Sequence, residues 1–373
     1  VPGDGGNQLE AKLNRSDTVH YLCEKTTSDY FTLWLNLEQL VPIIIDCWVD
    51  NIKLNYDNVT RTTSNRPGVD IRVPGFGTPT VVEWLDPIKF SVGSYFSYIA
   101  DALTTIGYER GVNIRGAPFD FRKAPNELSD YFKNLQLLIE ETYVLNGNTS
   151  VILIAHSMGG PLSMYFLQQM SQSWKDKYIH SLITLSAAWA GSVKSVKVFL
   201  MGDDLGVFLL QENILKQMQV TMPSVAWLMP SPYFWKPDEV FVQTEKKNYS
   251  LSNIKDLFMD IDYPVGWEMY KDQMVYRDFS APGVVVHCLH GYAVDTVERI
   301  VYGPGQFPDG KSTFVVGDGD GTVNRRSLEA CRIWNDHQKQ KIYYENFVNM
   351  DHMDILKDDR SISYILRVIN NIE

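Results

Sequence analysis

The stretch VILIAHSMGG, which begins at Val151, constrains the fold of this chain more than any other feature. A continuous run of β-branched and other apolar residues predicts a strand that is buried on both faces, as in a parallel sheet. Ser157 follows this strand, with Ala155 and Gly159 two positions to either side. The spacing of apolar residues over 161–170 then predicts a helix.

A serine between small residues, after a strand and before a helix, is typical of a nucleophile elbow that exposes the hydroxyl. The neighbours must be small because the strand and the helix approach closely, and here Ala155 replaces the first glycine of the usual pattern. The N–H of Met158 would then lie at the helix N-terminus, where it can serve an oxyanion hole. The alternative is a glycine-rich turn with an idle serine.

The segments 182–185, 314–316 and 343–348 also read as strands, and 355–372 reads as a closing helix. Strands that alternate with helices predict an α/β fold with a mostly parallel sheet. Roughly 125 residues separate the strand near Leu185 from the one near Phe314, which is too many for a single crossover. We therefore expect a second structural unit in that interval.

In this architecture the nucleophile, the acid and the histidine follow one another along the chain, each on a loop after a strand. Asp320 lies in the loop after 314–316, and His352 lies between 343–348 and the closing helix. We expect His352 to take the proton of Ser157 as general base, and Asp320 to orient the imidazole and stabilise its cation.

Other residues could take these roles, namely the histidines His156, His287, His290 and His337 and the aspartates Asp318 and Asp351. His156 is too close in sequence to turn back onto Ser157. His287 and His290 lie in an apolar strand context that favours structural roles, and His337 lies among polar residues of a predicted exposed helix.

The opening VPGDGGNQ predicts a glycine-rich loop, which in this architecture supplies the second oxyanion N–H, and Asp4 is the natural donor. The strand that should precede this loop is cut short at Val1. Because the chain begins with Val rather than Met, we expect that an upstream segment has been removed.

The stretch GDGDGTV resembles the start of a calcium loop, with Asp318, Asp320 and Glu329 at its first, third and twelfth positions. Thr322 and Val323 stand where an oxygen ligand and an obligatory glycine belong, so we predict no metal there. We expect no organic cofactor either.

Composition and charge limit the classes of molecule that this chain can bind. With 45% hydrophobic residues the chain can form a large core, and a net charge of −11 argues against nucleic acid. No apolar run approaches the roughly 20 residues that cross a bilayer, so we expect any membrane contact to be at the surface.

The cysteines and sequons together favour the secretory route. The four cysteines are Cys23, Cys47, Cys288 and Cys331, and none forms a CxxC pair, which argues against a zinc site. Two local disulfides are one of three possible pairings. Glycosylation sequons begin at Asn14, Asn58, Asn148 and Asn248.

The tract between the first two cysteines holds more large apolar residues than a surface loop normally shows, namely Trp34, Leu35, Leu37, Leu40, Val41, Ile43 and Ile44. Such residues can anchor an amphipathic element in the headgroup region of a membrane. The alternative is a hydrophobic stripe packed against the core.

Several blocks together resemble the lecithin–cholesterol acyltransferase family, and its lysosomal phospholipase A branch most closely. They include GNQLEAKL, WLNLEQLVPIIIDCWVDNIKLNY, PGVDIRVPGFG, RGAPFDFRKAPNE, WKDKYI and DGDGTVNRRSLEAC. The resemblance runs from Gly3 to about Asn370. It implies the triad Ser157, Asp320 and His352, the oxyanion donors Asp4 and Met158, and the disulfides Cys23–Cys47 and Cys288–Cys331.

The resemblance also implies an α/β-hydrolase fold with two insertions. We expect the start of the core with the oxyanion loop at 1–20, a membrane-binding disulfide loop at 21–50, core again at 51–195, a cap and lid at 196–285, and the rest of the core at 286–373. Within the cap, 201–235 would be a mobile lid over an acyl track, or else a static cap.

The implied function is that of a serine phospholipase A and transacylase. It would release an acyl chain from glycerophospholipids and pass it to water or to a lipid alcohol at a phospholipid membrane surface, as a monomer in the lysosomal lumen or outside the cell. The alternatives are a secreted phosphatidylcholine–sterol acyltransferase and an inactive lipid-binding homologue. The family tends to show Gly-Ala-Pro-Trp-Gly-Gly where this chain has SAAWAG at 186–191. This departure keeps the inactive homologue open as an alternative.

Asp4 leads to a hypothesis about pH. At the position of Asp4 the plasma acyltransferase branch is expected to carry a loop with a cysteine. Asp4 therefore makes this chain resemble the lysosomal branch more closely. If its N–H binds the oxyanion, an ionised carboxylate would oppose the developing charge and a protonated one would not. We therefore expect activity to favour acidic pH.

Overall fold

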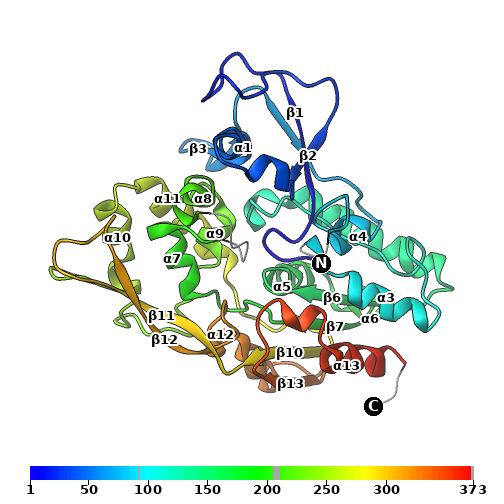
Figure 1. Cartoon of the computed structure of the whole chain (residues 1–373). Helices are drawn as coiled ribbons and strands as arrows, with labels where there is room; N and C mark the ends of the chain where they lie inside the picture. Colours follow the sequence, from blue (N-terminus) through cyan, green and yellow to red (C-terminus); the bar gives the residue numbers. More distant parts are fainter. Residues whose placement is uncertain (91–92, 205–210, 371–373) are drawn as a thin grey trace.

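The computed structural model describes residues 1–90, 93–204 and 211–370. Its centre is a parallel sheet with the strand order β13-β10-β7-β6 (Figure 1). These strands are β6 (Val151–His156), β7 (Ile179–Leu185), β10 (Val286–Tyr292) and β13 (Ile342–Val348). The predicted parallel sheet is confirmed, and β10 is a member that the sequence did not assign to it.

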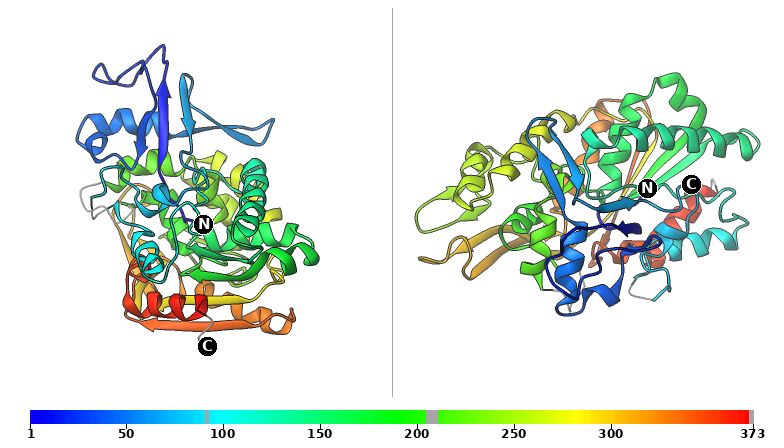
Figure 2. Two further views of the ribbon diagram at one scale, coloured as in Figure 1. Left: turned by 90° about the vertical axis from the view of Figure 1, so that its right-hand side faces the viewer. Right: turned by 90° about the horizontal axis from the view of Figure 1, so that it is seen from above.

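Helices cover both faces of this sheet, as the view from above shows (Figure 2). One face carries α4 (Ser129–Leu145), α5 (Gly159–Gln169) and α6 (Gln172–Tyr178), and the other carries α3 (Ser97–Thr105) and α13 (Asp359–Ile369). Helix α13 begins later than the predicted closing helix, because the side chain of Asp358 caps it and residues 354–356 form a separate 3₁₀ turn.

A second sheet has the order β12-β11-β8-β9, formed by β8 (Val242–Gln243), β9 (Asn248–Tyr249), β11 (Val294–Tyr302) and β12 (Ser312–Gly319). The predicted strand at 314–316 is therefore a strand, but it pairs antiparallel with β11 outside the central sheet. Ala293 adopts a left-handed φ of 64° between β10 and β11, and this turn carries the chain out of the parallel sheet.

An N-terminal lobe projects at the top of Figure 1 and packs against the rest of the molecule through buried residues of the main core. It contains the antiparallel sheet β2-β1-β5, the hairpin β3–β4, the 3₁₀ turn η1 and helix α1. Their bounds are β1 (Leu9–Leu13), β2 (Phe31–Trp34), η1 (Leu37–Leu40), α1 (Ile44–Ile52), β3 (Leu54–Asp57), β4 (Thr62–Asn65) and β5 (Val69–Arg72). A disulfide joins Cys23 to Cys47 of α1 in this lobe, as the resemblance implied.

The expected inserted unit lies between β7 and β10. It contains α7 (Val193–Met201), α8 (Glu212–Gln219), α9 (Pro223–Trp227), α10 (Ile254–Asp260) and α11 (Pro264–Gln273), together with β8 and β9. Residues 205–210 of the expected lid lie outside the described residues. The described part of 211–235 forms α8 and α9, and its large side chains Met222, Trp227 and Trp235 are buried.

The remaining elements are short: α2 (Thr80–Glu83), α12 (Arg325–Leu328) and the 3₁₀ turns η3 (Pro125–Glu127), η4 (Leu251–Asn253), η5 (Met274–Tyr276), η6 (Ala330–Asp336) and η7 (Asp354–Leu356). A second disulfide joins Cys288 of β10 to Cys331 of η6. It ties a strand of the central sheet to the segment that follows the loop of Asp320. Both disulfides therefore pair as the resemblance implied.

Candidate active site

The turn between β6 and α5 holds Ser157 with a positive φ of 53°, a conformation that non-glycine residues rarely adopt. A Cβ atom on Gly159 would come within 2.4 Å of the carbonyl oxygen of Pro2, and one on Gly160 within 2.4 Å of the Cβ of Ala187. These contacts explain why the elbow needs small residues. Ser157 itself is half-buried, so its hydroxyl remains accessible from the surface.

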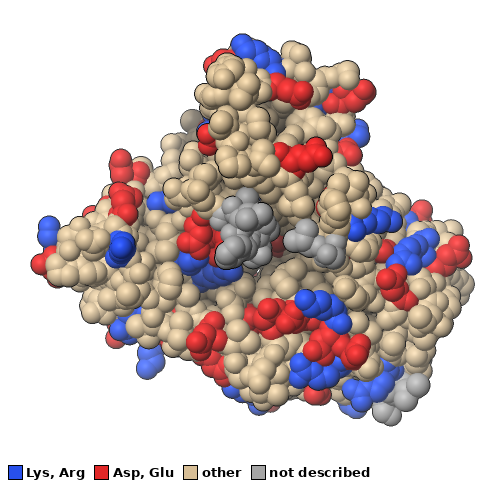
Figure 3. Space-filling model, viewed as in Figure 1, with Lys and Arg blue, Asp and Glu red and all other residues tan. Residues whose placement is uncertain are grey.

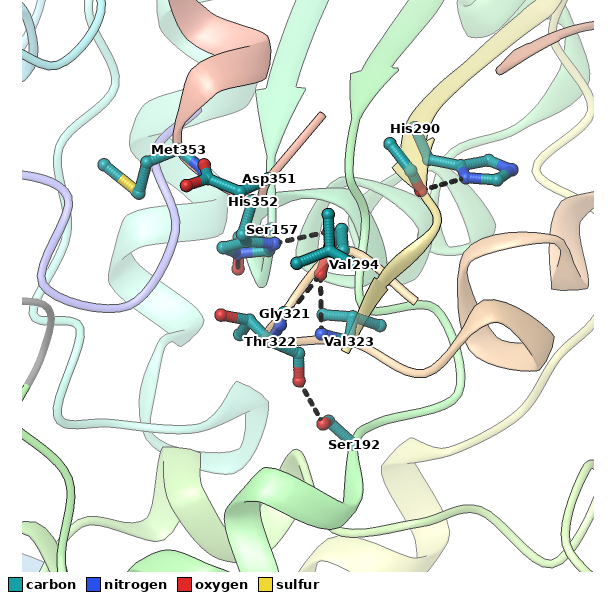
Figure 4. A network of polar contacts seen from close by, with 12 residues as sticks. Ser157, Ser192, His290, Val294, Gly321, Thr322, Val323, Asp351, His352 and Met353 are labelled. Carbon is teal, nitrogen blue, oxygen red and sulfur yellow. Dashed lines mark hydrogen bonds and ion pairs between the residues drawn. The ribbon is translucent and has the colours of Figure 1, made fainter. Parts of the chain in front are cut away.

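Three side chains that are distant in sequence meet at this turn, and Figure 4 labels two of them, Ser157 and His352. The Nε2 atom of His352 lies 2.9 Å from Oγ of Ser157. Its Nδ1 atom lies 2.7 Å from Oδ2 of Asp320. This geometry suits a proton relay in which one ring nitrogen faces the hydroxyl and the other faces a carboxylate.

The carboxylate of Asp320 is fully buried, but protein groups supply it with hydrogen bonds. Its Oδ1 accepts the N–H groups of Val323 at 2.7 Å and of Thr322 at 3.0 Å. Burial alone would raise the pKa of this carboxyl, but the nearby His352 and the two N–H groups outweigh burial and lower the pKa. The group is therefore ionised, as a partner for an imidazolium must be.

The loop of Asp320 is tied to the start of the inserted unit. The hydroxyl of Ser192 donates to the carbonyl of Thr322 at 2.5 Å (Figure 4). The N–H of Val193 donates to the side-chain oxygen of Asn324 at 3.0 Å. Residues at the stem of α7 thus hold the acid loop in place.

The alternative acids and histidines lie elsewhere. Asp318 pairs with Arg325 at 2.6 Å, and Asp351 accepts the N–H groups of its own loop. His287 and His290 are buried in β10, and His337 is exposed after η6. The structure therefore brings Asp320 and His352, rather than these residues, to Ser157.

The glycine-rich loop at the start of the chain passes directly beside the elbow, since a Cβ on Gly3 would lie 2.7 Å from Cβ of Ser157. The indole N–H of Trp34 donates to the carbonyl of Gly5 at 2.7 Å and anchors the loop. Among the hydrogen bonds of the described residues, none uses the N–H of Asp4 or of Met158. Both groups are thus free to bind an oxyanion.

Asp4 is an exposed residue, but the protein around its carboxyl partly desolvates that group. This desolvation and repulsion from Asp203 raise the pKa of Asp4 to about 7, against the opposing effects of the Gly5 N–H and of Lys194. The carboxyl of Asp4 therefore stays protonated to a higher pH than an ordinary carboxyl does.

Two buried residues lie behind the triad: Tyr95, which the sequence did not single out, and His156, which it offered only as an alternative base. The hydroxyl of Tyr95 accepts the N–H of Gly3 at 3.0 Å and lies 2.5 Å from Nδ1 of His156. The Nε2 atom of His156 lies 2.9 Å from the carbonyl oxygen of His352. His156 does not reach Ser157, as predicted, but it contacts the backbone of His352 instead.

The apolar tract of the first disulfide loop divides into two sets. Val41 and Ile43 are 47% and 51% exposed, and Leu37, Leu40 and Ile44 are half-buried. Trp34 and Leu35 are buried, because Trp34 anchors the glycine-rich loop and the N–H of Leu35 donates to the carbonyl of Leu85. For these two residues the predicted membrane contact was wrong.

A cavity of about 630 Å³ lies along β6 and is lined by Ile152, Ile154, Ile99, Leu135 and Ile369 among others. The triad side chains do not line it, so it is not an acyl site beside Ser157. The SAAWAG stretch at 186–191 is buried behind the elbow, where the N–H of Ala188 donates to the carbonyl of Ser157.

No helix of the described residues is both long and apolar enough to span a bilayer. The four sequon asparagines Asn14, Asn58, Asn148 and Asn248 are all exposed, so a glycosylating enzyme could reach each of them.

Comparison with known proteins agrees with this geometry. The profile of the family described as "Lecithin:cholesterol acyltransferase" matches residues 30–279 and 268–359. The chain is 44% identical to "Lysosomal phospholipase A and acyltransferase" of Homo sapiens over 99% of its own length and 89% of that protein. It is 40% identical to "Phosphatidylcholine-sterol acyltransferase" of Gallus gallus, over 95% of this chain and 86% of that protein. This chain therefore belongs to the lecithin:cholesterol acyltransferase family.

Proposed function

We propose that this protein is a serine phospholipase A and transacylase that works at a membrane surface. It cleaves an acyl ester of a glycerophospholipid and passes the acyl group to water or to a lipid alcohol. The observation that carries the proposal is the hydrogen-bonded series Ser157–His352–Asp320. The support for the substrate class is 44% identity over 99% of the chain to a lysosomal phospholipase A and acyltransferase.

The reaction follows from this geometry in two halves. Oγ of Ser157 attacks the ester carbonyl while Nε2 of His352 takes its proton, and the N–H groups of Met158 and Asp4 stabilise the oxyanion. His352 then returns the proton to the leaving lysolipid oxygen, which leaves an acyl-Ser157. In the second half His352 takes a proton from water or a lipid alcohol, which attacks the acyl group, and His352 then gives that proton to Oγ of the leaving Ser157, so that the free enzyme is restored.

Val41 and Ile43, with the half-buried Leu37, Leu40 and Ile44 beside them, are the side chains that we propose to enter the headgroup region. A phospholipid stays in its bilayer, so the enzyme has to reach it there. Each fully buried side chain of this kind contributes roughly 1.5–3 kcal/mol. A few of them therefore support reversible docking.

We further propose passage through the secretory route, ending in the lysosomal lumen or outside the cell. Two disulfides, the exposed sequons and the relatives named above support this. Acidic and basic side chains are interspersed on the face shown in Figure 3, without a broad basic patch for a polyanion.

The test is an acceptor assay on liposomes of phosphatidylcholine that contain either a ceramide or cholesterol. We expect free fatty acid in both and an acylated ceramide in the first, with Ser157→Ala inactive in both. Predominant formation of cholesteryl ester would instead identify a sterol acyltransferase. Absence of any product, together with no labelling of Ser157 by a fluorophosphonate, would identify an inactive lipid-binding homologue.

A further inference from the structure

We propose that Tyr95 and His156 are positioning residues, which hold the oxyanion loop and the His352 loop in register with Ser157; this inference rests on the function proposed above. The two side chains form a buried bridge between loops that are far apart in sequence. At one end Tyr95 binds Gly3, next to the oxyanion donor Asp4. At the other end His156 binds the backbone of the general base.

The chemistry of the bridge allows a single arrangement of protons. The carbonyl of His352 can only accept, so Nε2 of His156 has to carry the proton that it receives. Nδ1 of His156 is then unprotonated and accepts the O–H of Tyr95. The oxygen of Tyr95 is left with a lone pair, which accepts the N–H of Gly3. The Gly3 N–H thus donates to Tyr95, Tyr95 donates to His156, and His156 donates to the His352 carbonyl.

The bridge stays in this state at any working pH. His156 is 1% exposed, and burial, with a smaller effect of the nearby His352, lowers the pKa of its imidazole to about 3. Burial also raises the pKa of the Tyr95 hydroxyl. Both groups therefore remain neutral, so the bridge acts as a fixed support rather than as a proton carrier.

The backbone of His352 is consequently held from two sides. Its N–H donates to the carbonyl of Asp320 at 2.8 Å, and its carbonyl accepts Nε2–H of His156 at 2.9 Å. The imidazole is aimed by these two anchors as well as by the carboxylate of Asp320. Loss of one anchor lets Nε2 of His352 move away from Ser157, and a displacement near 1 Å costs on the order of a hundredfold in rate.

Two substitutions at one position separate the two ends of the bridge. In His156→Asn the amide oxygen replaces Nδ1 and can still bind Tyr95, but the donor to His352 is lost. In His156→Gln the amide nitrogen replaces Nε2 and can still donate to His352, but the acceptor for Tyr95 is lost. Tyr95→Phe removes the link to Gly3 and leaves the tautomer of His156 unspecified.

The readout is kcat and KM for a water-soluble short-chain nitrophenyl ester, so that membrane docking does not contribute. We expect His156→Asn to lower kcat by about 10- to 100-fold with KM within about twofold, and His156→Gln to recover at least about tenfold of that loss. We expect Tyr95→Phe to lower kcat by about tenfold. Tyr131→Phe removes the hydroxyl of another buried tyrosine and is the matched control.

The results distinguish this inference from the function on which it rests. If the wild-type protein neither hydrolyses the ester nor reacts with a fluorophosphonate, the proposed function fails. If it does both, but His156→Asn and His156→Gln are equally active, or Tyr95→Phe loses no more than Tyr131→Phe, the positioning role is overturned. Melting temperatures of all four variants show whether a loss of kcat merely follows unfolding.

Discussion

Asp320 holds His352 at two points, since its Oδ2 lies 2.7 Å from Nδ1 of the imidazole and its carbonyl oxygen accepts the His352 N–H at 2.8 Å. Side chain and backbone of one residue thus fix both the ring and the main chain of the other. Asp318, only two residues away, points instead to Arg325. The two aspartates of this loop therefore give a matched pair of substitutions.

Asp320→Asn should lower kcat by about 10⁴-fold, because an amide can present its N–H to Nδ1 and force the imidazole into the wrong tautomer. Asp318→Asn breaks a half-exposed ion pair and should leave kcat within about twofold. The measurement is the steady-state rate with a soluble ester. Equal losses in the two variants would contradict the assignment of the acid.

The pH profile should depend on Asp4. Its pKa is raised to about 7, so the carboxyl is neutral below that pH and ionised above it. Ionisation places a negative charge near the oxyanion, and activity should fall as the pH rises through this range. Asp4→Asn stays neutral and should keep its activity to higher pH. An acid optimum that Asp4→Asn leaves unchanged would refute the hypothesis.

A second variant sharpens that test. Asp203 contributes to the raised pKa of Asp4 by repulsion, whereas Lys194 acts in the opposite sense. Asp203→Asn should therefore lower the pKa of Asp4 and move the alkaline decline in activity to lower pH. The double variant with Asp4→Asn should show no such displacement of the decline.

Membrane binding should depend on Val41 and Ile43. Replacing both with Ser should weaken co-sedimentation with phosphatidylcholine liposomes by about tenfold or more, since even partial insertion of each side chain contributes free energy. Leu137→Ser is the control, because Leu137 is 61% exposed on α4, away from the disulfide loop. Wild-type binding by the double variant would remove this surface from the proposal.

Ile43 offers a way to separate binding from stability. Its φ of 74° is strained for a β-branched residue. Ile43→Gly should relieve that strain and hold or raise the melting temperature, while liposome binding decreases. A parallel decrease of both quantities would show that the side chain stabilises the fold instead.

The elbow should tolerate no added methyl group at Gly159. A Cβ there would meet the carbonyl oxygens of Pro2 at 2.4 Å and Val1 at 2.6 Å, so Gly159→Ala should destabilise the fold by about 1–3 kcal/mol and lower activity. At Gly303 the nearest atom to an added Cβ is 3.9 Å away. Gly303→Ala should leave the melting temperature close to that of the wild type.

The candidate triad was predictable from sequence because each member depends on local pattern and chain order. Ser157 follows an apolar run directly, and Asp320 and His352 each follow a strand-like segment. Chain order in this architecture then favours Asp320 and His352, but only the folded chain separates Asp320 from the alternative acids Asp318 and Asp351. The same reasoning needs no knowledge of which strands pair with one another.

The sequence did not predict which strands pair with one another or which apolar side chains of one tract are buried. The strand at 314–316 was recognised, but its antiparallel partner β11 placed it outside the central sheet. Trp34 and Leu35 belong to the same apolar tract as Val41, and only the contacts with Gly5 and Leu85 show that they face inward. Tyr95 carried no signal at all, since its partners are contacts that only the folded chain creates.

The disulfides have a practical consequence for producing this protein. The bridges close loops whose ends are 24 and 43 residues apart, and cross-links of that span stabilise a fold by roughly 3–4 kcal/mol each. A bacterial cytosol keeps thiols reduced and would withhold much of that stabilisation. Expression with export into an oxidising compartment should therefore give soluble material where cytosolic expression gives aggregates.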